Sequence, residues 1–154
     1  MAMHTWFECK IRYEKVMENG MQKKVTEPYL VDALSFTEAE ARIIEEMTPF
    51  ISGEFTVSDI KRANYSELFP CEEEAADRWF KCKLVFITLD EKSGAEKKTS
   101  TQVLVQAADL RDAVKKLDEG MKGTMADYQI ASVAETAIMD VYPYSAEPDD
   151  KPEV

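Results

Sequence analysis

The feature that most constrains the fold of this chain is a segment that occurs twice. Residues 6–13 read WFECKIRY, and residues 79–86 read WFKCKLVF. Trp, Phe, Cys and Lys stand at the same places in both segments, and apolar residues follow in step. This repetition predicts a chain built from two copies of one small unit.

The match extends over most of the chain. Asp109 takes the place of Ser35 as a helix N-cap, Gly94 takes the place of Gly20 in a turn, and Pro143 takes the place of Pro70. We therefore interpret the chain as a tandem duplication of a β-β-α-β unit. Repeat one covers residues 5–70, repeat two covers 79–143, and residues 71–78 form an acidic seam between them.

The first hairpin of each unit follows from alternation. In residues 5–15, apolar and polar side chains alternate, which is the period of a half-buried strand. Asn19-Gly20 is a strong hairpin-turn signal, so we expect the return strand over about residues 22–33. Pro28 cannot donate a ladder hydrogen bond, and this predicts an edge position or a bulge there.

The period then changes to that of a helix. Ser35 and Glu38 fit a capping box, and apolar residues follow at steps of three or four until the helix ends near Pro49 and Gly53. In the second unit, Asp109 begins a matching helix whose apolar stripe starts at Leu110. We expect one long strand over residues 55–69, with a bulge between Val57 and Ile60 where alternation slips.

Together these elements predict an α+β fold of six main strands and two helices with pseudo-twofold symmetry. We expect one compact domain over residues 1–144, in which the two copies share a core or extend one sheet. Residues 145–154 are acidic and contain almost nothing apolar, so we expect a disordered tail.

Composition limits the partners and the cellular compartment that we expect for this chain. The formal net charge of −11 disfavours unspecific adhesion to DNA or anionic lipid, although it leaves room for a local basic face. The sequence has no apolar run long enough to span a membrane and no visible secretory signal. Three cysteines without close spacing are typical of a reduced, cytoplasmic protein.

Signatures of chemistry are missing. His4, Cys9, Cys71 and Cys82 can be drawn as a zinc site, but no C-x-x-C spacing supports it, and buried structural thiols are the favoured interpretation. The chain has no nucleophile elbow and no Gly-rich phosphate loop. We therefore expect no enzyme, no cofactor and no metal.

One candidate binding face does stand out. The polar side of each first strand carries a tryptophan beside cations, an arrangement that stacks single-stranded bases while following phosphates. The six residues are Trp6, Lys10, Arg12, Trp79, Lys81 and Lys83. A tryptophan at a strand end more often packs at a core rim, and lysine on strands also guards against edge pairing.

The favoured function is a non-catalytic interaction module. Sheet edges in a duplicated hairpin fold invite β-augmentation by a peptide of a protein partner, or pairing into a homo-oligomer. Single-stranded nucleic-acid binding on the tryptophan and cation face is the alternative.

Three segments, residues 6–13, 29–42 and 79–83, together resemble a small bacterial domain family of unknown function from gut Bacteroidetes and their mobile elements. The resemblance covers nearly the whole chain short of the tail. It implies a stand-alone cytoplasmic protein without an assigned activity, and it transfers no site residue.

Overall fold

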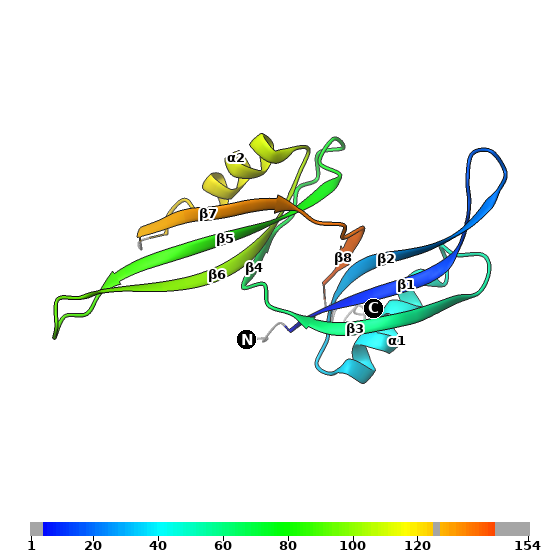
Figure 1. Ribbon diagram of the computed structural model, residues 1–154, viewed down its shortest axis with the longest axis horizontal. Coiled ribbons are helices and arrows are strands. Elements are labelled where there is room, and N and C mark those ends of the chain that lie inside the picture. The colour runs from blue at the N-terminus through cyan, green and yellow to red at the C-terminus, as the bar shows by residue number, and fades with distance from the viewer. Residues whose placement is uncertain (1–4, 125–126, 144–154) are drawn as a thin grey trace, which may run out of the picture. The chain divides into compact units, whose positions relative to one another are not determined.

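The computed structural model describes residues 5–124 and 127–143, which form an α+β structure of two helices and eight strands in two four-stranded sheets. These residues group into two compact units (Figure 1). Among the described residues, unit 1 contains 5–63 and 138–143, and unit 2 contains 64–124 and 127–137. The units differ in extent from the predicted repeats, because residues 64–70 lie in unit 2 and residues 138–143 lie in unit 1.

Unit 1 is a sheet in the order β3-β1-β2-β8 with one helix on it. Its hairpin turns at Gly20, whose φ of 84° is a conformation that glycine adopts readily. The third strand pairs antiparallel with the first. The elements are β1 (Trp6–Val16), β2 (Gln22–Asp32), α1 (Phe36–Met47), β3 (Phe55–Ala63) and β8 (Asp140–Tyr142).

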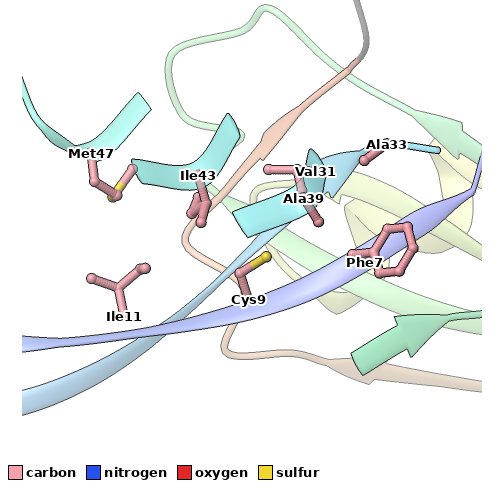
Figure 2. Close-up of a cluster of buried hydrophobic side chains, with 8 residues drawn as sticks. All are labelled: Phe7, Cys9, Ile11, Val31, Ala33, Ala39, Ile43 and Met47. Atoms are coloured by element: carbon pink, nitrogen blue, oxygen red, sulfur yellow. The ribbon is translucent and has the colours of Figure 1, made fainter. Parts of the chain in front are cut away.

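The core of unit 1 lies between the sheet and α1. Alternate residues of β1 point toward α1, and side chains of α1 spaced by four residues point toward the sheet (Figure 2). Full burial of one large aliphatic side chain contributes about 1.5–3 kcal/mol. The buried cluster consists of Phe7, Cys9, Ile11, Val31, Ala33, Ala39, Ile43 and Met47.

Unit 2 repeats this arrangement in the order β7-β5-β6-β4, with α2 packed on β6 and β7. Its core is a second cluster that includes Phe80, Cys82, Leu84 and Leu117. The elements are β4 (Glu67–Phe69), β5 (Arg78–Leu89), β6 (Glu96–Ala107), α2 (Leu110–Gly120) and β7 (Asp127–Glu135). The two sheets are separate, so the predicted option of one extended sheet is wrong.

The expected long strand over residues 55–69 is also wrong, and with it the count of six strands. The chain forms β3, leaves the sheet after Ala63, and forms β4 in the other sheet. Ala63, the last residue of β3, pairs with Trp6, the first residue of β1. Residues 67–69 then pair with β6 in the other sheet.

One predicted irregularity is confirmed: the register of β1 and β3 shifts between Lys10 and Ile11, so that Ser58 is the extra residue of a bulge. The edge position or bulge predicted at Pro28 is wrong, because β2 lies between β1 and β8 and keeps an unbroken register with β1. Pro28 is accommodated differently: its carbonyl oxygen accepts a hydrogen bond from the Met139 N–H at 2.9 Å. Because N and C=O of one strand residue point to the same side, the nitrogen of Pro28 faces away from β1 and no β1 bond is lost.

Both helices begin where the sequence predicts, but fewer residues of each predicted apolar stripe are buried than expected. Ser35 Oγ accepts the Glu38 N–H at 3.1 Å, and Asp109 Oδ1 accepts the Asp112 N–H at 2.8 Å. Leu110, expected in the apolar stripe, is 51% exposed, because it is the first residue of α2 and only Ala113 and Leu117 are fully buried.

Candidate functional site

The predicted cationic faces lie on the side of each sheet that the helix does not cover. Phe7, Cys9 and Ile11 face α1, so the alternate residues Trp6, Lys10 and Arg12 face the other way. By the same alternation, Trp79, Lys81 and Lys83 lie on the helix-free face of β5 in unit 2.

Both tryptophans are buried, Trp6 to 7% and Trp79 to 5% exposure. A base cannot stack on an indole whose face is covered. The cations differ from one another: Arg12, Lys81 and Lys83 are exposed, whereas Lys10 is half-buried.

The lysines of unit 2 stand among uncharged neighbours. Lys81 lies opposite Leu104 and Ala134 in the ladder, and Lys83 lies opposite Gln102 and Ser132. In unit 1, by contrast, Lys10 lies opposite Asp59. Of the three exposed cations, Lys81 and Lys83 therefore lie together on β5, and Arg12 lies on β1 opposite Thr26 and Thr56.

The thiols are inside the cores. Cys9 and Cys82 are completely buried, and burial raises the pKa of Cys9 to about 12 and that of Cys82 to about 11. Such thiols are poor nucleophiles and poor metal ligands at neutral pH, because both roles need the thiolate. Within residues 5–124 and 127–143, no three His, Cys, Asp or Glu side chains are grouped to hold a metal ion; His4 lies outside those ranges.

A feature that the sequence argument missed is the docking of β8 on unit 1. β8 runs parallel to β2, with Tyr29 opposite Asp140 and Val31 opposite Tyr142. The Tyr142 ring stacks on the Tyr29 ring, with 6.2 Å between centroids. Arg42 of α1 donates through Nη2 to the Pro143 carbonyl oxygen at 3.2 Å, and through Nη1 to the Asp32 carbonyl oxygen.

Unit 2 holds β4 in the same way. β4 runs parallel to β6, from Glu67 opposite Val103 to Phe69 opposite Val105. Before it, the Ser66 N–H donates to the Gln102 carbonyl oxygen at 2.8 Å. After it, the Cys71 N–H donates to Gln106 Oε1 at 2.9 Å.

A cation on α2 holds the chain that follows β4. Lys116 Nζ lies 3.1 Å from Glu73 Oε1 and 2.8 Å from Asp112 Oδ2. These contacts raise the pKa of Lys116 above its usual range, the hydrogen bond to Asp112 being the largest cause. Lys116 thus holds the predicted acidic seam on α2, as Arg42 holds the segment after β8.

The two docked segments share a chemical pattern. Residues 67–70 read ELFP and residues 140–143 read DVYP: an acid, an aliphatic residue, an aromatic residue and proline. This repetition was visible in the sequence. Its meaning was not, because extended character alone does not say which sheet a strand joins.

Opposite the docked strands, each sheet ends in a strand with one paired side. Among the described elements, β3 pairs only with β1, and β7 pairs only with β5. A concavity of about 820 Å³ lies at the hairpin end of unit 1 and includes Arg12, Tyr13, Lys24 and Phe55 in its lining.

Next to that concavity, two tyrosines share one carboxylate. Tyr13 Oη donates to Glu27 Oε1 at 2.9 Å, and Tyr29 Oη donates to the same oxygen at 3.2 Å. Burial raises the pKa of Tyr13 to about 12, with a further contribution from Glu27. Neutral tyrosines of this kind are hydrogen-bond donors and not bases at physiological pH.

Comparison with known proteins gives a family but no assigned activity. No curated protein matches the chain. In the part of the chain that the structure describes, no helix is both long and apolar enough to cross a membrane. A family model described as "Domain of unknown function (DUF4494)" matches residues 5–144, and the chain therefore belongs to the DUF4494 family.

Proposed function

We propose that this chain is a non-catalytic interaction module that binds an extended segment of a protein partner along the open edge of β7. The observation that carries the proposal is that the fold already uses β-augmentation, because each sheet holds a short parallel strand added at one edge. The edge opposite β4 in unit 2 is β7, which offers backbone donors and acceptors over Asp127–Glu135.

The side chains favour β7 over β3 as the receiving edge. Residues 128–134 of β7 contain no charged residue and no proline, whereas β3 carries Asp59, Lys61 and Arg62. Charges on an edge strand discourage pairing with another chain. β3 is therefore the guarded edge and β7 the permissive one.

The ladder also shows which backbone groups of β7 are available. The Thr136 N–H donates to the Trp79 carbonyl oxygen at 2.9 Å, so Thr136 faces β5. In a strand the peptide groups of successive residues alternate in direction. The N–H and C=O of Val133 and Glu135 therefore point to the open side of the sheet.

The test is a selection of peptides on the full chain, since the partner is unidentified. A displayed random peptide library is enriched on the immobilised protein, and the selected peptides are titrated by fluorescence anisotropy. We expect apolar or aromatic residues at alternate positions of the enriched peptides, because an added strand presents one face to the sheet. An unenriched library counts against the proposal.

Two matched variants locate the binding. Ala134→Lys adds a charge on β7, and Ala41→Lys adds the same charge on the exposed surface of α1. We expect Ala134→Lys to lower peptide affinity by roughly tenfold or more, because it introduces an edge guard and an unpaired charge at the interface. Equal affinities of the two variants would place the binding site elsewhere.

Single-stranded nucleic-acid binding remains the second hypothesis. The observation in its favour is the exposure of Lys81 and Lys83 among uncharged neighbours, and the burial of both indoles weighs against base stacking. Titration of a labelled oligonucleotide at low and moderate salt tests it. Binding that weakens steeply with salt and is lost in Lys81→Ala/Lys83→Ala supports it; no binding at low salt excludes it.

We further propose that the two units arose by tandem duplication of one ancestral domain in a bacterial cytoplasmic protein. The same order of strands within each sheet, the same N-cap geometry and matching bulges at Lys10/Ile11 and Lys83/Leu84 support a common origin. The free thiols Cys9, Cys71 and Cys82 support a reducing compartment.

A further inference from the structure

Unit 1 is completed by a segment from the other end of the sequence. Its hairpin, α1 and β3 lie within the first 63 residues. Its fourth strand, β8, follows in the sequence only after unit 2, which spans Asn64–Ala137. β8 is therefore joined to β1, β2 and α1 by non-covalent contacts alone, apart from the long path through unit 2.

These contacts are local. They include the three residue pairs of the β2–β8 ladder, the Met139 N–H donating to the Pro28 carbonyl oxygen, the packing of Tyr142 on Tyr29 and on the unit 1 core, and the hydrogen bond of Arg42 to Pro143. Every one of them depends on the sequence of residues 138–143 and on no particular connection to it. The same segment from a second copy satisfies them equally.

From this we infer a second function of the β2 edge: it takes the Ile138–Pro143 segment of a second copy, so that two chains exchange β8 reciprocally and form a dimer. Exchange of an identical element is a low-cost route to dimers, because the docking contacts of the monomer are reused between chains. This site is distinct from the β7 edge proposed above, and it stands or falls separately.

Mass action fixes the conditions under which the dimer is populated. Monomer and dimer make the same docking contacts, so the balance depends on protein concentration relative to the effective concentration of the tethered segment. For short flexible tethers that value is on the order of millimolar. The dimer fraction therefore rises as the protein approaches this concentration, and mild destabilisation that releases β8 speeds the exchange.

Cysteine cross-linking distinguishes docking within a chain from docking between chains. Pro28 and Met139 are adjacent in the β2–β8 pairing, and Met139 is 50% exposed. One protein carries Pro28→Cys and another carries Met139→Cys, both with Cys71→Ser. The two are mixed at about 1 mM, the tethered segment's effective concentration, and oxidised. In the control mixture, Leu89→Cys replaces Met139→Cys; Leu89 is an exposed residue at the end of β5. We expect the mixture with Met139→Cys to give several-fold more mixed disulfide dimer than this control.

The double variant Pro28→Cys/Met139→Cys is the internal check. It should close an intramolecular disulfide at low concentration and then lose the dimer seen by light scattering. A mixed dimer no more abundant than in the control overturns the proposal. So does a strict monomer by light scattering for the unmodified chain at about 1 mM, a measurement that does not depend on how the cysteine variants fold.

Discussion

The Phe69 ring packs directly against the backbone of Gly120: a Cβ atom added to Gly120 would lie 2.8 Å from Phe69 Cε1 and 2.9 Å from Phe69 Cδ1. Gly120 is the last residue of α2, and Phe69 is the last residue of β4. Helix and docked strand therefore meet so closely that any side chain at residue 120 would force the Phe69 ring to move. In unit 1 the docked aromatic residue is Tyr142, whose pKa is raised to about 12 by burial and by the nearby carboxylates of Asp140 and Glu46.

Replacing Gly120 with alanine should loosen the β4 dock. In a helix, alanine is more favourable than glycine by about 0.8–1.0 kcal/mol. Here the added methyl group must displace the Phe69 ring, which costs about 1–3 kcal/mol at other overpacked sites, so we expect a net destabilisation of up to about 2 kcal/mol. Urea denaturation of the two proteins measures this difference.

A double-mutant cycle separates the clash from other effects. In a Phe69→Ala background the ring is gone, and Gly120→Ala should become neutral or stabilising, because only helix propensity remains. Gly53→Ala is the matched control, since nothing lies within 4 Å of a Cβ at Gly53. The same loss of stability in both Phe69 backgrounds would contradict the assigned contact.

The helix caps offer a second prediction. Asp109→Ala removes the acceptor of the Asp112 N–H, and Ser35→Ala removes that of the Glu38 N–H. Each should lower the free energy of unfolding by about 1 kcal/mol. Asp109→Asn keeps an acceptor at the cap and should change stability by only a few tenths of a kcal/mol, as is common for good N-cap residues. An Asp109→Asn loss as large as that of Asp109→Ala would show that charge, and not capping, matters there.

Local signals predicted much of each unit. Asn19-Gly20 marked the hairpin turn, Ser35 and Asp109 marked the helix starts, and the slip between Val57 and Ile60 marked the bulge. Each signal acts within a few residues, through a backbone conformation or a capping bond, and so can be found in the sequence.

Pairing between distant segments could not be predicted in the same way. Residues 67–69 have the same extended character whether they continue β3 or join β6, and the choice of β6 is a pairing between distant segments that a local pattern does not encode. The roles of Arg42, Lys116 and Gly120 follow from that choice. For the same reason, the burial of Trp6 and Trp79 lay beyond what alternation along one strand can say.

Because Tyr13 and Tyr29 both donate to Glu27, we expect the stability of the fold to fall at alkaline pH. Tyr13 has an unperturbed pKa of 10.0, and in the folded protein it rises to about 12. Between these values the unfolded chain loses the proton first, so the stability contributed by neutral Tyr13 is present below pH 10 and falls as the pH rises toward 12. Tyrosinate absorbance at about 295 nm should show a late-titrating component, since free tyrosine ionises near pH 10. Tyr13→Phe should remove part of that late-titrating component. If Tyr13→Phe instead removes a component that titrates near pH 10, the raised pKa of Tyr13 is contradicted.

The last prediction concerns the hold of α1 on β8. Arg42 donates to the Pro143 carbonyl oxygen at 3.2 Å and also to that of Asp32 at the end of β2, so Arg42→Ala removes a hydrogen bond that links the segment after β8 to α1. A hydrogen bond from a charged donor contributes about 1.5–3 kcal/mol, and partial exposure brings the expected loss to the lower end. Hydrogen exchange of residues 138–143, followed by mass spectrometry, should therefore accelerate by roughly tenfold, since 1.4 kcal/mol is a factor of ten in an opening equilibrium. Arg111→Ala, an exposed arginine on α2, should leave this segment unchanged. If Arg42→Ala instead leaves exchange of the segment unaltered, then the β2 ladder and the Tyr29–Tyr142 stack hold β8 without help from the helix.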